Sequence, residues 1–275
     1  MGCQVGSFPL PYLGMPLSIN KPRVVDFFPL LKRIETRLQG CSTLLSHGDK
    51  LVLIKSVFAS MPIFYMSILA IPMIVVQQLN KYLRQCFWRK YGSEENTPAL
   101  IAWDKACLPK SHGGMGILDI STHNQALLMK FLHKFLNKHD LPWVKMIWES
   151  HYNEQVPGVK ATGSFWWKDI MKLLPTFKQF SHCKAGIGDT IMFWKDPWQE
   201  VQLQLKYPEL FSFAIQMDIT LQKALQADNT EDLFHRPLSI AAHHQYLELQ
   251  TLLLSHDTME HNDTWTYKWT NSNFS

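Results

Sequence analysis

Two pairs of adjacent acidic residues are the first candidates for chemistry in this 275-residue chain, Glu94-Glu95 and Glu231-Asp232. Clustered carboxylates can hold two divalent metal ions, which activate an attacking oxygen and stabilise a leaving group in phosphoryl transfer. Glu94-Glu95 lies in a polar stretch that is typical of a loop, and Glu231-Asp232 precedes an expected helix. Neither setting favours a two-metal centre, so we assign no catalytic residue.

Histidine and cysteine could instead hold a zinc ion, since the chain has twelve His and five Cys. Structural zinc sites need ligand pairs at short, regular spacings. His182 and Cys183 are adjacent, while His243-His244 and the His256/His261 pair have no cysteine at a suitable distance. We therefore predict no metal ion and no cofactor. The five cysteines are odd in number and form no CxxC pair, which indicates free thiols in a reducing compartment.

Two further patterns resemble parts of known active sites without completing them. Cys107 and His112 stand five residues apart in a glycine-rich stretch, but no third residue completes a nucleophilic site. Gly186 and Gly188 lack the third glycine and the following helix of a dinucleotide-binding loop. We interpret Gly186-Asp189 as the turn of a hairpin, which the FWKDPW sequence (193–198) extends and pins to neighbouring helices.

The charge of the chain is uneven. Residues 1–112 hold 13 lysines and arginines against 6 acids, and the remainder holds 14 against 17. A basic N-terminal part favours a polyanionic partner, such as nucleic acid or an anionic membrane. The alternative is an ordinary solvated basic surface. Lys130, Lys134 and Lys138 form a further row at helical spacing that is either a phosphate-facing edge or a solvated face.

Hydrophobic periodicity predicts the elements that would position these residues. A helix over 24–39 would bury Val24, Phe27, Phe28, Leu31, Ile34 and Leu38. Asp49 would cap a helix that runs to Pro62, and a helix over 73–90 would bury Val76, Leu79, Leu83, Cys86 and Phe87. Further helices are expected over 121–137, 142–152, 164–174 and 238–255, with short strands around Gly113-Gly114.

One uncharged segment, 56–76, is long enough to span a bilayer. Pro62 and Pro72 divide it into short pieces, which favours buried helices over a membrane span. The N-terminus has no signal peptide, so we expect an intracellular protein, nuclear or cytoplasmic, that is not secreted.

Several motifs in order resemble the region after the catalytic palm of plant non-LTR (LINE-type) retrotransposon reverse transcriptases. They are YLGMPLS (12–18), LSHGDKLVLIKSVFASMPIFYMS (45–67), FWRK (87–90), IAWDKACLPKSHGGMGILDI (101–120), NQALLMKF (124–131), GIGDTIMFWKDPW (186–198) and DTWTYKW (263–269). The resemblance is weaker over 150–185 and 200–260. It implies that the chain starts at the passage from palm to thumb, and that its tail leads into the family's zinc-binding region.

The same resemblance implies which residues act. The family's palm supplies adjacent catalytic aspartates, and this chain has no Asp-Asp pair. A thumb holds duplex phosphates with lysine and arginine, largely without reading sequence. The candidates for these contacts are Lys50, Lys55, Arg84, Arg89, Lys90 and Lys110. Trp88 and Trp103 either stack on bases or belong to the core.

We therefore expect a mainly α-helical chain with small β hairpins, truncated at both ends. Residues 1–90 would form a thumb-like helical part, 91–200 a linker with a glycine-rich loop and the FWKDPW hairpin, and 201–275 a helical segment leading into a truncated zinc-binding module. The expected function is nonspecific, non-catalytic RNA and DNA binding, with no small-molecule substrate. The alternatives are a degenerate transposon relic without specific activity and a helical protein-interaction or membrane-associated module.

Overall fold

Helices make up most of the structure, a computed structural model that describes residues 8, 10–12, 15–41, 45–88, 100–152, 157, 162–227, 229–254 and 261–268. The strands form two small antiparallel sheets, β1 with β2 and β3 with β4. The prediction of a mainly α-helical chain with small β elements is confirmed. The chain divides into two units, Met1–Leu128 (unit 1) and Met129–Ser275 (unit 2), and helix α6 (Ile120–Leu136) contains the boundary.

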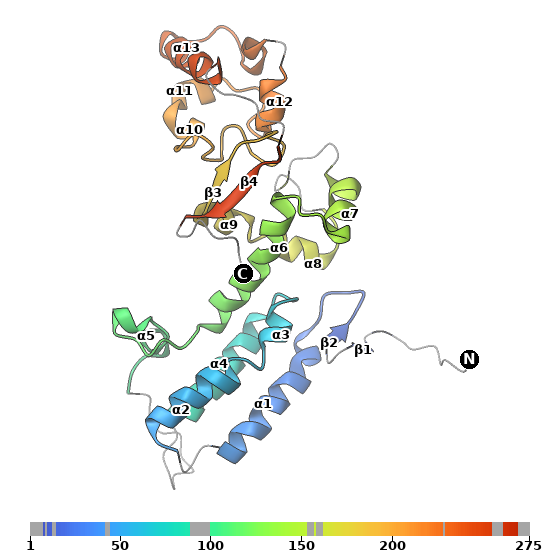
Figure 1. Cartoon of the computed structure of the whole chain (residues 1–275), viewed down its shortest axis with the longest axis vertical. Coiled ribbons are helices and arrows are strands. Elements are labelled where there is room, and N and C mark those ends of the chain that lie inside the picture. The colour runs from blue at the N-terminus through green and yellow to red at the C-terminus, as the bar shows by residue number, and fades with distance from the viewer. Residues whose placement is uncertain are drawn as a thin grey trace, which may run out of the picture. The chain divides into compact units, whose positions relative to one another are not determined.

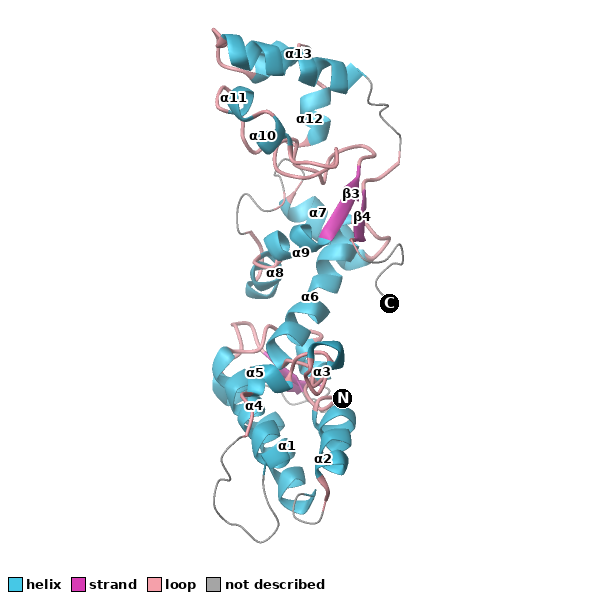
Figure 2. Cartoon of the chain, turned by 90° about the vertical axis from the view of Figure 1, so that its left-hand side faces the viewer, coloured by secondary structure: helices cyan, strands magenta, loops and turns pink. Residues whose placement is uncertain are grey.

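Unit 1 begins with a hairpin in which β1 pairs with β2 and Tyr12 stands opposite Met15. Helices α1, α2 and α4 follow and lie side by side, with α4 packed against both of the others (Figures 1 and 2). The elements of unit 1 are β1 (Leu10–Tyr12), β2 (Met15–Leu17), η1 (Val24–Phe27), α1 (Phe28–Cys41), α2 (His47–Leu53), η2 (Ile54–Phe58), α3 (Ile63–Met66), α4 (Met73–Trp88), α5 (Trp103–Ala106), η3 (Lys110–His112) and the first part of α6.

The long helices of unit 1 bury most of the predicted stripes; Val24 and Leu38 are only partly buried. All five residues predicted to face inward from α4 are buried, since a 3.6-residue period places them on one side of the helix. On α1, Leu31 and Ile34 are buried, whereas Phe28 is 54% exposed. The cap of α2 is Ser46 rather than the predicted Asp49, because Asp49 takes the third position and closes a capping box with Ser46.

The uncharged segment 56–76 is not one helix. It contains the end of η2, the short helix α3 and the start of α4, with breaks near Pro62 and Pro72 as expected for residues that remove a backbone donor. Among the described residues, no helix combines the length and apolar character needed to cross a membrane.

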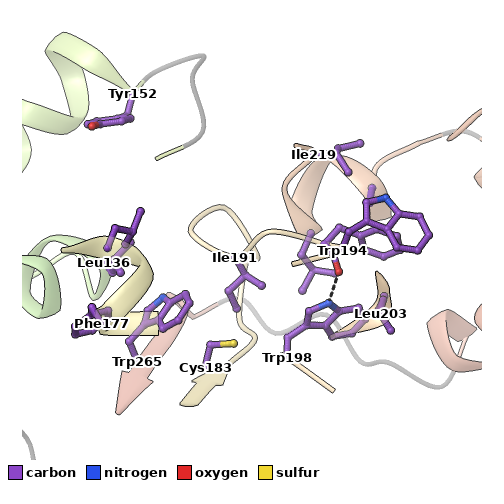
Figure 3. Packing of buried hydrophobic residues seen from close by; sticks show 14 of the residues in the cluster. Leu136, Tyr152, Phe177, Cys183, Ile191, Trp194, Trp198, Leu203, Ile219 and Trp265 are labelled. Carbon is purple, nitrogen blue, oxygen red and sulfur yellow. Dashed lines mark hydrogen bonds between the residues drawn. The ribbon is translucent and has the colours of Figure 1, made fainter. Parts of the chain in front are cut away.

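Unit 2 gathers aromatic side chains from both ends of its sequence into one core. Trp265 of β4 is fully buried and lies near Phe177, Cys183 and Ile191, while Trp194 and Trp198 pack further along the same cluster (Figure 3). The remaining elements are α7 (Pro142–His151), α8 (Phe165–Met171), α9 (Leu174–Phe180), β3 (Ser181–Lys184), α10 (Leu203–Lys206), α11 (Pro208–Phe211), α12 (Leu221–Leu225), η4 (Thr230–Leu233), α13 (Ile240–Leu254) and β4 (Thr264–Tyr267).

The described part of the chain tail joins the core of unit 2. Residues 264–267 pair antiparallel with 181–184, with Trp265 opposite Cys183. Buried residues from Met129 to Trp265 share one core, and the division into two units falls between Leu128 and Met129.

The predicted hairpin at Gly186-Asp189 is also wrong. The segment leaves β3 as a loop, and Met192 bridges to Thr220 instead of pairing back. The FWKDPW sequence is a compact turn in which Asp196 accepts hydrogen bonds from Met192 N (2.7 Å) and Lys178 Nζ (2.6 Å). Its tryptophans, Trp194 and Trp198, do anchor the turn, since both are buried.

Candidate nucleic-acid interface

The segment 103–116 of unit 1 folds back on itself through its backbone. Met115 N donates to Ala106 O (3.0 Å), and Gly116 N donates to Leu108 O (2.9 Å). The short helices α5 and η3 lie within this loop. The segment forms this hydrogen-bonded loop instead of the short strands predicted around Gly113-Gly114. The hydrogen bonds fix the backbone that carries the charged side chains of the segment.

The loop is fixed to helix α4 at one point. Trp103 is 8% exposed, and its Nε1 donates to Asn80 Oδ1 at 3.3 Å. The backbone oxygen of the same asparagine accepts a hydrogen bond from Arg84 Nε (3.3 Å). Arg84 therefore lies on α4 next to the place where the loop docks.

A second point fixes the loop to η2. Lys55 is half-buried, and its Nζ donates to Met115 O at 2.5 Å. Gly116 has φ +64°, and a Cβ added there would lie 3.4 Å from Lys55 Nζ and 3.6 Å from Lys110 Cγ. Lys55 and Lys110, which are far apart in the sequence, therefore lie against the same glycine.

These contacts gather four basic side chains around one loop. We call Lys55, Arg84, Lys105 and Lys110 the loop cluster. Arg84, Lys105 and Lys110 are exposed, so their positive side chains face solvent. Such a surface can attract phosphate groups without recognising bases.

The structure does not place every predicted contact in this cluster. Lys50 is only 3% exposed, because it precedes the buried residues Ile54 and Phe58 by four and eight positions on one helical face. It is therefore not available to a phosphate in this conformation. Arg89 and Lys90 lie outside the described residues.

Of the two alternatives for Trp88 and Trp103, base stacking or the core, the structure shows the core. Trp88 is 7% exposed and Trp103 is 8% exposed. Trp88 packs edge-on against Phe87 with ring centroids 4.9 Å apart. A base cannot stack on either ring without rearrangement of unit 1.

The lysine row on α6 is not a continuous phosphate-facing edge. Lys134 is exposed and Lys130 is half-buried. Lys138 forms an ion pair with Asp189, and its Nζ lies 4.7 Å from the centre of the Trp148 ring. The last lysine of the row therefore stabilises unit 2 internally.

Cys107 and His112 do not form a nucleophilic pair. Burial, with smaller contributions from Asp119 and Asp104, raises the pKa of the Cys107 thiol to about 11, so the thiol is protonated at neutral pH. His112 Nδ1 lies 3.0 Å from Ser111 Oγ. In the described part of the chain, no group of three or more His, Cys, Asp or Glu residues could hold a metal ion.

The two units differ in how their charges are neutralised. In unit 2, five lysines and one arginine pair with acids: Lys138 with Asp189, Lys145 with Asp140, Lys172 with Asp169, Lys178 with Asp196, Lys195 with Asp218 and Arg236 with Glu231. Six other lysines of unit 2 are exposed without an ion pair to a described acid: Lys134, Lys168, Lys184, Lys206, Lys223 and Lys268. In unit 1, several exposed cations have no ion pair with a described acid: Lys32, Arg33, Arg37, Lys81, Arg84, Lys105 and Lys110.

Three of the five described acids of unit 1 bind backbone amides, and the other two, Glu35 and Asp104, are exposed. Asp26 accepts from Arg23 N (2.7 Å), Asp49 from Ser46 N (3.2 Å) and Asp119 from Thr122 N (2.8 Å). Each carboxylate thus binds a backbone amide near the start of a helix, as caps do. The positive side chains of unit 1 consequently face solvent with little compensation.

Sequence reasoning missed Lys105 and the exposed cations of α1. Lys105 lies two residues after Trp103, in a segment that carries part of the family resemblance, and this position was the available signal. Lys32, Arg33 and Arg37 are exposed, and nothing in the sequence assigned them to a binding face.

Gly114 holds the loop in shape, and we expect Gly114→Ala to open it. A Cβ at this position would lie 2.0 Å from Leu108 O, a distance that only backbone movement can relieve. The expected loss is about 2 kcal/mol or more in the stability of the loop. Hydrogen exchange at Met115 and Gly116 measures it.

Gly113→Ala is the matched control, because a Cβ there meets nothing within 4 Å. Its φ of +78° limits the expected penalty to about 1 kcal/mol. Equal exchange rates in the two variants would show that the loop does not depend on the close approach at Gly114.

The chain is similar to one curated plant protein, described as a "Putative ribonuclease H protein" from Arabidopsis thaliana. The two are 26% identical over 191 residues, which cover 67% of this chain and 31% of the relative. The chain thus spans about a third of the length of that protein. No protein-family model matches the chain, and no solved structure matches it.

Proposed function

We propose that this chain is a non-catalytic part of a protein of retroelement origin, and that unit 1 binds RNA and DNA duplexes through their phosphates. The observation that carries the proposal is the set of exposed cations in unit 1 without an ion pair to a described acid, which includes Arg84, Lys105 and Lys110 of the loop cluster. The similarity to the Arabidopsis relative supports an origin among nucleic-acid-processing proteins. The motifs shared with LINE-type reverse transcriptases support the finer assignment to a thumb.

Phosphate contacts predict a specific dependence on salt. Each contact releases about 0.7–0.9 of a counterion, so affinity falls linearly on a logarithmic scale as salt rises. We expect a nonspecific dissociation constant on the order of micromolar or weaker at physiological salt. Fluorescence anisotropy with a labelled RNA–DNA hybrid across a salt series measures both quantities.

The decisive variant changes Arg84, Lys105 and Lys110 together to alanine. All three side chains are exposed, so folding should be unaffected, while the salt slope should fall by roughly 2 to 3. The matched control changes Lys145, Lys172 and Lys195, which also removes three charges but from ion-paired sites in unit 2.

Two outcomes would refute the proposal. One is an equal loss of affinity in both triple variants, and the other is binding without any salt slope. A relic without specific activity predicts no measurable binding by either protein. A membrane-associated module predicts binding to vesicles that survives loss of the loop cluster.

A further inference from the structure

The two-stranded sheet of unit 2 has one buried and one exposed face. Successive residues of a strand alternate between the faces, and residues opposite each other in an antiparallel pair share a face. Ser181, Cys183 and Trp265 are buried, and Figure 3 shows the last two among the buried residues of the core. The residues that alternate with them on β3 and β4 therefore point away from the core.

The outward-pointing residues form three cross-strand pairs. The register between β3 and β4 gives two of them. The third follows from the hydrogen bond that Lys268 N donates to Phe180 O (3.1 Å), which continues the ladder by one pair beyond the strands. Five of the six residues are exposed, and Thr266 is partly buried. We call them the ribbon face: Phe180 with Lys268, His182 with Thr266, and Lys184 with Thr264.

The ribbon face carries positive charge and no acid. Unit 2 as a whole is slightly acidic, since residues 129–275 hold 14 lysines and arginines against 16 acids. Lys184 and Lys268 are nevertheless exposed without an ion pair to a described acid. They stand at opposite ends of the face, four strand residues or about 13 Å apart. An anion that meets both lysines must therefore be extended, as a chain of phosphates is.

An aromatic ring lies at one end of the same face. Phe180 is 37% exposed and stands opposite Lys268. His182 follows it on the same side at two residues, or about 6.6 Å. Exposed aromatic rings beside cations are platforms on which unpaired bases stack, whatever the base. In a duplex the bases are already stacked on each other, so such a ring favours a single strand.

A neighbouring cavity does not share this charge. Lys268 also lines a cavity of about 610 Å³. Three lysines and three acids line this cavity, and two of the lysines, Lys178 and Lys195, are in ion pairs. Because these charges cancel, the ribbon face and not the cavity is the surface of unit 2 that fits a polyanion.

From this arrangement we propose that the ribbon face binds single-stranded nucleic acid, with a base stacked on Phe180 and phosphates held by Lys184 and Lys268. This would be a second nucleic-acid site, which differs from the one proposed for unit 1 in preferring unpaired bases. It does not rest on duplex binding by unit 1. Two phosphate contacts and one stacked base make the binding weak and tolerant of base sequence.

Fluorescence anisotropy of the full chain with a labelled oligouridine, which stays single-stranded, tests the phosphate contacts. Changing Lys184 and Lys268 together to alanine should lower the salt slope by roughly 1.4, or 0.7 for each lysine. The matched control changes Lys168 and Lys223, two other exposed lysines of unit 2 that have no ion pair to a described acid. Equal effects of the two double variants would overturn the proposal.

Phe180→Leu tests the stacked base separately from the charge. It should weaken oligouridine binding about fivefold or more and leave the salt slope unchanged, because no cation is removed. Phe180→Trp keeps an aromatic ring and should bind at least as tightly as the unchanged chain. Hydrogen exchange of β3 checks that both variants are folded. A Phe180→Leu chain that binds oligouridine as tightly as the unchanged chain would refute the site.

The triple variant of Arg84, Lys105 and Lys110 separates this site from unit 1. In that background an RNA–DNA hybrid should bind weakly, whereas oligouridine binding should still respond to Phe180→Leu. Failure of the unchanged chain to bind the hybrid would refute the function proposed for unit 1 and leave the ribbon face standing. Loss of the response to Phe180→Leu in the triple variant would refute the ribbon face alone.

Discussion

Replacing Asp263 by alanine should destabilise unit 2 by about 4 kcal/mol or more, a large share of the roughly 5–15 kcal/mol that stabilises a domain. Asp263 is 2% exposed. Its Oδ1 accepts from Gly186 N (2.9 Å) and Gly188 N (2.7 Å), and its Oδ2 accepts from Thr190 N (2.9 Å) and Thr190 Oγ1 (2.8 Å).

The size of the effect follows from what alanine leaves behind. Three backbone N–H groups would remain buried without an acceptor, at about 1–3 kcal/mol for each. Thr190 Oγ1 also accepts from Trp265 Nε1 (3.0 Å), so the change reaches the centre of the core. Asp263→Asn should be destabilising too, because its amide would direct an N–H towards the donors it now meets.

Hydrogen exchange of residues 181–190, combined with denaturant unfolding, measures this loss. The control is Asp218→Ala, which removes a carboxylate from an exposed pair with Lys195 and should change stability by about 1 kcal/mol or less. If the Asp263 and Asp218 variants unfold at the same denaturant concentration, the Asp263 carboxylate does not hold the 186–190 loop in place.

Gly186→Ala provides an independent test of the contact between Asp263 and the 186–190 loop. A Cβ at Gly186 would lie 2.1 Å from His261 O, so the loop could not remain close to the residues that precede β4. This variant keeps the Asp263 carboxylate but moves the loop away from it. The backbone amides of the loop that now donate to Asp263 should therefore exchange faster with solvent.

The contacts of Asp263 join segments that are far apart in the sequence, and contacts of this kind are the part of the fold that the sequence did not predict. The helices over 24–39 and 73–90 were foreseen in position and largely in orientation, because helical periodicity is local. The β3–β4 pair was not foreseen, because its strands, Ser181–Lys184 and Thr264–Tyr267, are far apart in the sequence and no turn joins them directly. The alternation in DTWTY, with Trp265 buried and Thr264 exposed, indicates a strand but not its partner.

The candidate interface was predicted only in part, because its residues come together from distant parts of the sequence. The family resemblance, together with residue type and net charge, pointed to Lys55, Arg84 and Lys110, which the structure brings to one loop. Lys50 has the same charge, yet it shares a helical face with Ile54 and Phe58, and that spacing could have excluded it. The convergence of Lys55 and Lys110 on Gly116 depends on a loop that only the tertiary structure defines.

Asn124 is the residue through which α6 holds unit 1 together, and Asn124→Ala should reduce the stability of that unit by about 2–4 kcal/mol. The side chain is 6% exposed. Its Nδ2 donates to Met66 O (2.7 Å) and Leu69 O (2.9 Å), and its Oδ1 accepts from Ile71 N (3.0 Å). Met66 is the last residue of α3, and Leu69 and Ile71 lie between α3 and α4.

Two variants separate the role of these hydrogen bonds from the role of side-chain size. Asn124→Asp preserves the shape but turns a carboxylate oxygen towards two carbonyl oxygens, so it should destabilise unit 1 at least as much as alanine does. Asn80→Ala, which removes one bond of 3.3 Å to Trp103, should cost about 1 kcal/mol. Denaturant unfolding and exchange at Ile71 measure the differences. An Asn124→Asp protein as stable as the unchanged chain would mean that the amide does not hold this turn, and that packing alone joins α6 to the helices of unit 1.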